Sequence, residues 1–187
     1  MLLILKQSTM RTLKQFMLLA MTMSLVSLSS CSKDDDGGSG GNAASGTLAA
    51  SIDGSSWQSL EISSSATIAN NGNNLIIIAT NSDGKAFSMS IFGYEGVGTY
   101  EFTGATVGVF NTASYSETDV DLSNPQNSTT ELWQAPYDDT LAGTVSISEE
   151  TDTNIKGTFE FTCKNVNGDQ SIKTITQGSF DLEKQTS

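Results

Sequence analysis

The chain has 187 residues, a formal net charge of −12 and no histidine. Without histidine, the Ser-His-Asp and Cys-His types of nucleophilic catalysis and histidine-ligated metal sites are excluded. The excess of acidic over basic residues argues against nucleic acid as a partner, because such binding requires clustered Lys and Arg. A binding or structural protein is therefore expected rather than an enzyme.

The first thirty residues have the composition of a secretory signal peptide. Lys6, Arg11 and Lys14 supply positive charge, and this segment contains no acid. An apolar run interrupted by Ser and Thr follows over 16–28. A basic segment before a short apolar one is the layout of a signal, and the run falls short of the roughly 20 apolar residues that span a bilayer. Residues 1–30 are therefore predicted to be removed.

The apolar run ends in Leu28, Ser29, Ser30 and Cys31. This sequence resembles a lipobox, in which an apolar residue and two small ones precede the cysteine. The resemblance implies a diacylglyceryl group on Cys31, cleavage before it and acylation of the new amino group. Two or three acyl chains hold a protein firmly at a membrane, whereas one binds marginally. The alternative is an ordinary cleaved signal followed by a chance cysteine.

Residues 31–45 are predicted to be a flexible, lipidated linker. An acidic run at 34–36 precedes a Gly/Ser tract that has no means of packing. The acidic run resembles the export signal that follows the lipidated cysteine in surface lipoproteins of Bacteroidota, which implies an outer-membrane protein exposed at the cell surface. The alternative is a solubilising spacer.

Loss of three of the nine basic residues with the signal would change the net charge from −12 to −15. So acidic a chain does not dock on anionic lipid headgroups, and the acyl anchor must hold the protein at the membrane.

Residues 46–187 are predicted to form one β-rich domain. β-branched and aromatic residues alternate with polar ones, Gly and Asn punctuate the runs, and no helical apolar stripe is sustained. The expected strands lie at 47–52, 57–62 (with a possible extension at 67–69), 75–79, 86–92, 99–102, 107–110, 141–148, 155–164 and 171–182.

Three local patterns predict how these strands connect. The Asp83-Gly84 pair between two β runs indicates a hairpin. The run at 75–79 is apolar on both faces, which predicts a central strand covered on both sides. The last three strands are joined by short polar connections and should form an antiparallel meander.

The side chains of Cys163 and Trp57 are both expected in the core. Cys163 shares strand parity with Phe159 and Phe161, which favours a small buried thiol over a nucleophile. If Cys31 carries lipid, Cys163 has no disulfide partner.

Glycines begin several β runs, each followed by Thr, Ser or an apolar residue. Each is interpreted as a strand entry or bulge where a missing side chain permits a bend or a close approach. These glycines are Gly46, Gly98, Gly143, Gly157 and Gly178.

The β motifs at 52–57, 143–147, 157–161 and 175–180 together resemble an uncharacterised family of Bacteroidota lipoproteins. The resemblance extends over about 46–183 and implies no activity or binding residue. The predicted fold is all-β, an antiparallel β-sandwich of about eight or nine strands, with a calycin-like β-barrel as the alternative.

The candidate ligand site is Trp133, Tyr137, Asp138 and Asp139, which follow a polar stretch at 111–130. Long insertions in compact domains are often functional. Trp133 and Tyr137 would stack on a ring, and the two acids would bind hydroxyl groups. The alternative is that Trp133 plugs an end of the sandwich and Tyr137 covers an edge.

Carboxylates suggest two further chemistries. Asp138 and Asp139, with Asp119 or Asp121, could offer oxygen ligands to Ca²⁺, although no EF-hand spacing is present. Paired carboxylates could also support glycoside hydrolysis. The candidates for that pair are Glu95, Glu101, Asp138 and Asp139.

The leading functional hypothesis is a non-catalytic, membrane-anchored lipoprotein that binds a glycan or another small extracellular ligand, with no cofactor beyond the lipid on Cys31. One alternative is an accessory subunit of an envelope complex, with an envelope protein as partner. The other is a glycoside hydrolase.

Overall fold

The computed structural model describes residues 43–105 and 111–186. The predicted signal peptide, Cys31, the linker up to residue 42 and the strand expected at 107–110 lie outside the described residues.

Two short 3-10 helices occupy Glu61–Ser63 and Pro125–Asn127, and no helix in the described part is long and apolar enough to cross a membrane. The strands are β1 (Thr47–Ile52), β2 (Ser55–Gln58), β3 (Ser64–Ala69), β4 (Asn74–Thr80), β5 (Lys85–Phe92), β6 (Gly98–Thr103), β7 (Thr112–Asp119), β8 (Thr129–Ala135), β9 (Leu141–Glu150), β10 (Asn154–Asn165) and β11 (Ile172–Thr186).

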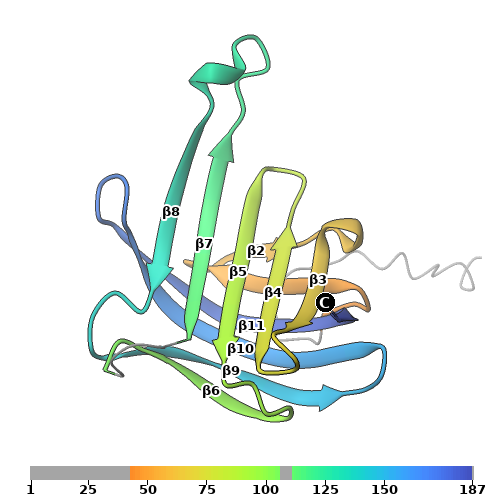
Figure 1. Ribbon diagram of the computed structural model, residues 1–187. Coiled ribbons are helices and arrows are strands. Elements are labelled where there is room, and N and C mark those ends of the chain that lie inside the picture. The colour runs from red at the N-terminus through yellow and green to blue at the C-terminus, as the bar shows by residue number, and fades with distance from the viewer. Residues whose placement is uncertain (1–42, 106–110, 187) are drawn as a thin grey trace, which may run out of the picture. The chain divides into compact units, whose positions relative to one another are not determined.

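The strands form one 11-stranded sheet in the order β2-β1-β11-β3-β4-β5-β7-β8-β10-β9-β6, with an additional β10–β11 pairing. Figure 1 shows β3, β4, β5, β7 and β8 as one layer and β11, β10, β9 and β6 as a layer behind it. The two long strands join the layers at both edges. Lys184 to Thr186 of β11 pair with β3, while Lys164 and Asn165 of β10 pair with β8.

The all-β class predicted from the sequence is confirmed. The described residues form 11 strands rather than about eight or nine, and among their pairings only β11–β3 is parallel. Because β10 and β11 pair with strands of both layers, the ladder closes on itself through β3, β4, β5, β7 and β8. The fold therefore combines the facing layers of the predicted sandwich with the continuous sheet of the calycin-like alternative.

The additional strands arise mainly at β7 and β8, where the sequence suggested a long polar insertion. The two strands pair in register from Ala113↔Ala135 to Asp119↔Thr129. Along β7, Ala113 and Tyr115 are buried, while Thr112, Ser114 and Ser116 are not. This is period-2 alternation, but Ala is a weak hydrophobic marker and Ser and Thr fill the outer face, so the pattern looks polar.

β4 is central in the sheet but covered on one face only, which corrects the expectation of double cover. Leu75, Ile77 and Ala79 are completely buried, whereas Ile78 is 46% exposed. β4 lies between β3 and β5 within the front layer. Only the inner face of that layer meets the other layer, so apolar residues on both faces do not imply two covering layers.

Aromatic rings fill the space between the layers. Phe87 of β5 lies 5.6 Å from Phe159 and 6.2 Å from Phe161 of β10, measured between ring centroids. Trp57 is only 6% exposed, which confirms its predicted place in the core. The predicted Asp83-Gly84 hairpin joins β4 to β5, and β9, β10 and β11 form the predicted meander.

Glycines allow β9, β10 and β11 to approach their neighbours closely, as the sequence suggested. A Cβ on Gly157 would overlap the Ser146 carbonyl oxygen and lie 2.6 Å from Phe180 Cζ, and one on Gly178 would lie 2.7 Å from the Phe159 ring. Gly98 differs, because an added Cβ there would contact only Tyr100, at 4.0 Å.

Cys163 is expected to be unreactive in the folded domain. It is completely buried, and burial, reinforced by the charge of Asp53, raises the pKa of its thiol to about 12. In the mature chain carrying Cys31→Ser, a thiol-specific chromogenic reagent should label Cys163 only after urea is added, because the thiolate is the reacting species. Rapid, complete labelling of the folded protein at mildly alkaline pH would contradict this prediction.

Candidate functional site

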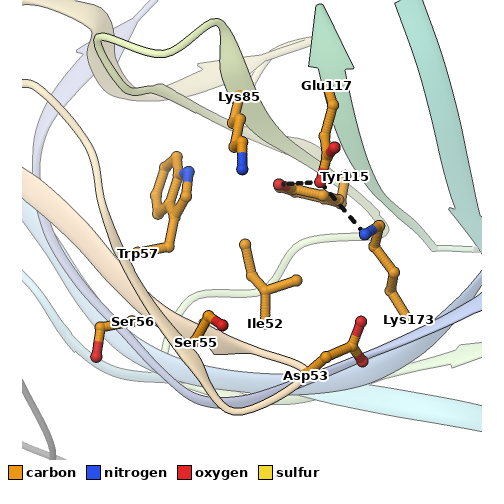
Figure 2. A pocket seen from close by; sticks show the side chains of 9 residues that line it. All are labelled: Ile52, Asp53, Ser55, Ser56, Trp57, Lys85, Tyr115, Glu117 and Lys173. Carbon is orange, nitrogen blue, oxygen red and sulfur yellow. Dashed lines mark hydrogen bonds and ion pairs between the residues drawn. The ribbon is translucent and has the colours of Figure 1, made fainter.

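A cavity of about 210 Å³ lies where the ends of β5, β7 and β11 meet the β1–β2 turn. Lys85 begins β5, Glu117 lies near the end of β7, Lys173 is the second residue of β11, and Asp53 occupies the β1–β2 turn. Figure 2 shows their side chains around a common space. The complete lining is Ile52, Asp53, Ser55, Ser56, Trp57, Lys85, Tyr115, Glu117 and Lys173.

Aromatic rings held by the core form one wall of the cavity. Tyr115 is 1% exposed, and its ring centroid lies 5.1 Å from that of Phe87. Trp57 approaches Phe87 from the other layer in an edge-on arrangement, at 4.8 Å and 85°. Such pairs contribute beyond their buried area, so this wall is rigid and preformed.

A charged network crosses the cavity from Tyr115 to Lys173. The Tyr115 hydroxyl donates a hydrogen bond of 2.8 Å to Glu117 Oε1, and Lys173 Nζ lies 3.3 Å from the same oxygen. Lys173 Nζ also lies 4.4 Å from the centroid of the Trp133 ring, a cation–π contact. This network fixes Glu117 and Lys173 against each other.

The pKa values of Tyr115 and Glu117 are shifted in opposite directions. Burial raises the pKa of Tyr115, and its hydrogen bond to Glu117 raises it further. For Glu117, burial opposes ionisation, but the hydrogen bonds from Tyr115 and Lys173 and the charges of Lys173 and Lys85 outweigh it, so the pKa of the carboxyl is lowered. Glu117 is thus held as the carboxylate and Tyr115 as the neutral phenol.

Glu117→Gln is expected to reduce the pH dependence of stability. The folded-state pKa of Glu117 lies below the ordinary value of 4.5. Its ionisation therefore adds to the free energy of unfolding above that pH, and this contribution is lost as the pH falls through the folded-state pKa. The substitution should remove about 1 kcal/mol at neutral pH, a modest figure because the side chain is partly solvated. Urea unfolding at neutral pH and in the acid range measures both effects.

Glu160→Gln is the matched control for Glu117→Gln. Glu160 is an exposed carboxylate on β10 that forms no ion pair within the described residues. Its substitution should leave the stability difference between neutral and acid pH unchanged. An equal effect of both substitutions would show that general surface charge, and not the Tyr115–Glu117–Lys173 network, sets the pH dependence.

The Asp53 carboxylate is also occupied. Asp53 has a positive φ of 50° in the β1–β2 turn, and its Oδ1 accepts a hydrogen bond of 2.8 Å from the Thr174 backbone N–H. Its own N–H donates to the Thr174 carbonyl oxygen at 2.9 Å. The turn is thereby tied to the start of β11, which closes this side of the cavity.

Two hydrogen-bond donors at the cavity have no partner among the described residues. Trp57 Nε1 is buried without an acceptor, and an unsatisfied buried donor costs about 1–3 kcal/mol. Lys85 forms no ion pair in the part of the chain that the structure describes, unlike Lys156, Lys173 and Lys184. Figure 2 shows the Trp57 indole nitrogen and the Lys85 ammonium pointing into the cavity.

The structure does not bring the four sequence-predicted ligand residues together. Trp133 is 3% exposed in β8, with its Nε1 donating to Ser171 Oγ at 3.0 Å. Its ring lies 5.8 Å from Tyr115 and beneath Lys173. It therefore has no free face on which a ligand from solvent can stack, and the interpretation of Trp133 as core is the one that the geometry supports.

Tyr137, Asp138 and Asp139 lie on the surface connection after β8. Tyr137 is 38% exposed and lines a second cavity of about 290 Å³ with residues that include Gln134 and Lys164. Asp138 Oδ1 accepts hydrogen bonds from the Thr140 backbone and hydroxyl, and these lower the pKa of Asp138. This acid is therefore engaged in its own turn.

The oxygen ligands suggested for Ca²⁺ are not gathered in the described part of the chain. Within residues 43–105 and 111–186, no group of three or more His, Cys, Asp or Glu side chains is placed to hold a metal ion. Asp138 and Asp139 thus have no third acidic ligand there.

The sequence contained weak signals for the actual cavity. Trp57 was assigned to the core, which is correct, but its position beside a cavity was not foreseen. Tyr115 and Glu117 fell in the stretch interpreted as a polar insertion. Lys85 follows the Asp83-Gly84 turn directly, and a lysine there looks like an ordinary solvated strand end.

Comparison with protein families gives one match, over residues 44–181, to the family described as Domain of unknown function (DUF6252). The chain belongs to this family. The match to DUF6252 confirms the expectation of an uncharacterised family and contains every residue that lines the cavity in Figure 2. Comparisons with curated proteins and with solved structures returned no match.

Proposed function

We propose that the DUF6252 domain of this chain is a non-catalytic binding module for a small extracellular ligand, a glycan or a compound of similar polarity, that occupies the cavity beside Trp57. The observation that carries the proposal is the pairing of a preformed aromatic wall with two unpartnered donors, Trp57 Nε1 and Lys85 Nζ. Pockets that combine apolar surface with a few convergent polar groups are the usual form of small-molecule sites.

The electrostatics of the cavity support binding over catalysis. A glycoside hydrolase needs one carboxylic acid whose pKa is raised so that it can protonate the leaving group. The pKa of Glu117 is lowered, the opposite of this requirement. An assay with aryl glycosides should therefore give no release of aglycone, and hydrolysis abolished by Glu117→Gln would establish the enzymatic alternative instead.

The ligand screen uses the mature chain with Cys31→Ser, which removes the anchor. Mono- and oligosaccharides and small organic acids are tested by thermal shift, and each hit is repeated with Lys85→Met. A ligand that stabilises the protein by mass action, and loses this effect in Lys85→Met, supports the cavity as the site. Ligands that stabilise Lys85→Met as much as the unsubstituted domain would show that they bind elsewhere.

The lipid anchor on Cys31 is the second part of the proposal. It rests on the lipobox pattern Leu28, Ser29, Ser30 and Cys31 and on the acidic run after it, which favours export to the outer surface of the outer membrane. Metabolic labelling with a palmitate analogue should mark the wild type and not Cys31→Ser. Protease treatment of intact cells should digest the wild-type protein if it faces the outside, and resistance to protease would contradict surface exposure.

An accessory subunit of an envelope complex is a second candidate, favoured by the β7–β8 connection. This hairpin extends beyond its neighbours in Figure 1, and Val120 and Leu122 at its tip are 53% and 88% exposed. Exposed apolar side chains mark contact surfaces when they gather. Purification from detergent as a lone monomer would count against this role.

A further inference from the structure

The cavity beside Trp57 is lined by a lysine, Lys85, that forms no direct ion pair within the described residues. Lys173 is paired with Glu117 at 3.3 Å, and Asp53 accepts a hydrogen bond from the Thr174 N–H. Lys85 alone among the charged lining residues has no ion pair or side-chain hydrogen bond within the described residues. Lys85 pairs with Glu117 across the strands and its charge acts on that carboxylate, but its ammonium makes no hydrogen bond to it. The ammonium can therefore still donate to an anion from outside.

The second free donor restricts the chemistry of that anion. Trp57 Nε1 can only donate, and the Lys85 ammonium can only donate. A carboxylate offers two oxygens and accepts from both at once, and such charge-assisted bonds are shorter and stronger than neutral ones. A neutral hydroxyl group on a ligand would offer Lys85 a weaker acceptor than a carboxylate does.

The carboxylate of Glu117 supplies an acceptor at the cavity. Both the Tyr115 hydroxyl and Lys173 Nζ contact Glu117 Oε1, while Glu117 Oε2 has no partner in the described part of the chain. Glu117 lines the cavity (Figure 2), so a ligand hydroxyl that reaches its carboxylate can donate to it. The volume of about 210 Å³ is below the roughly 300–1,000 Å³ of pockets for drug-sized ligands, so the part of the ligand that enters the cavity is about one ring.

We propose that the cavity binds a small hydroxylated carboxylate, a monosaccharide acid, with its carboxylate held by Lys85 and Trp57 and a hydroxyl held by Glu117. This inference rests on the proposed function, because it names the ligand class of the same site.

The test compares glucuronate with glucose and galacturonate with galactose on the mature chain carrying Cys31→Ser. The chain has two tryptophans, so the indole N–H region of a ¹⁵N NMR spectrum reports Trp57 and Trp133 separately. Trp133 is an internal control, because its Nε1 already donates to Ser171. We expect glucuronate or galacturonate to shift the Trp57 signal and not that of Trp133, with the neutral hexose binding at least about tenfold more weakly, a difference of roughly 1.4 kcal/mol.

Two lysine variants complete the experiment. Lys85→Met should weaken binding of the sugar acid at least about tenfold. Lys164→Met should leave it unchanged, because Lys164 also forms no ion pair within the described residues but lines the other cavity. Trp57→Phe keeps an aromatic ring in place and removes the indole N–H donor. It should therefore weaken binding of the sugar acid more than binding of the neutral hexose.

Each outcome decides a different statement. Equal binding of acid and hexose at the Trp57 signal overturns the carboxylate assignment and leaves the proposed binding function standing. Binding that shifts Trp133, or that survives Lys85→Met, overturns this placement of the ligand. No response to either acid at millimolar concentration overturns the inference, and if the wider screen also finds no ligand, the proposed function fails with it.

Discussion

Phe87→Ala is expected to destabilise the domain by about 3–5 kcal/mol, the range for removing a large aromatic side chain from a packed core. Phe87 is completely buried, and its ring contacts the rings of Trp57, Tyr115, Phe159 and Phe161. These partners come from both layers, so the cavity left by the substitution has walls on separate strands that cannot collapse together. Urea unfolding followed by circular dichroism measures the loss.

Phe92→Ala is the matched control for Phe87→Ala. Phe92 ends the same strand and is 40% exposed, so its removal leaves no enclosed cavity and should change stability by less than about 1 kcal/mol. Because Phe87 also supports Trp57 and Tyr115, Phe87→Ala should abolish ligand binding in any protein that remains folded. Similar losses of stability for both variants would contradict the placement of Phe87 at the centre of the core.

Gly143→Ala is expected to destabilise the protein by about 3 kcal/mol or to prevent folding, although it adds a single methyl group. A Cβ at Gly143 would overlap the Glu160 carbonyl oxygen and the Phe161 Cα, and it would lie 2.5 Å from the Phe161 Cβ. Two of these three atoms belong to the backbone of the paired strand β10. Overpacking against backbone requires the strands to separate, at a cost of about 1–3 kcal/mol or more. Soluble yield and the midpoint of thermal unfolding are the measurements.

Gly98→Ala controls for the general effect of replacing a strand glycine. Gly98 lies in β6, which also pairs with β9, and an added Cβ there meets only the Tyr100 ring at 4.0 Å. That is ordinary contact, so Gly98→Ala should be neutral or slightly stabilising, since Ala has less conformational freedom to lose than Gly. A strong loss of stability with Gly98→Ala and none with Gly143→Ala would refute the close approach of β9 to β10.

The strands that the sequence predicted well have large apolar residues at alternate positions. β10 is an example, where Phe159, Phe161 and Cys163 are buried and the residues between them are not. The β4–β5 hairpin was predictable because Asp83 and Gly84 tolerate the turn backbone, and Gly84 has a φ of 73°. In both cases the information is local, carried by neighbours within a few residues.

β7 and β8 escaped prediction because their inward residues are few and mixed in size. Ala113 and Tyr115 on β7 and Trp133 and Ala135 on β8 are the buried residues, and the surrounding Ser, Thr and Glu resemble a loop. Their assignment depends on cross-strand partners, such as Tyr115 opposite Trp133. Pairing between strands supplies the hydrogen bonds and packing that local composition does not show.

From the sequence alone, the absence of histidine, the acidic charge, the all-β class, the terminal meander and the buried state of Trp57 and Cys163 could be determined. Each follows from composition or from period-2 alternation within one segment. The candidate site could not be determined from the sequence, because its residues come from four strands that are far apart in the chain: Trp57 from β2, Lys85 from β5, Tyr115 and Glu117 from β7, and Lys173 from β11. Alternation decides which face of a strand a residue occupies, but not which strand ends meet. Only the pairing that closes β11 and β10 onto the front layer brings these five side chains around one cavity.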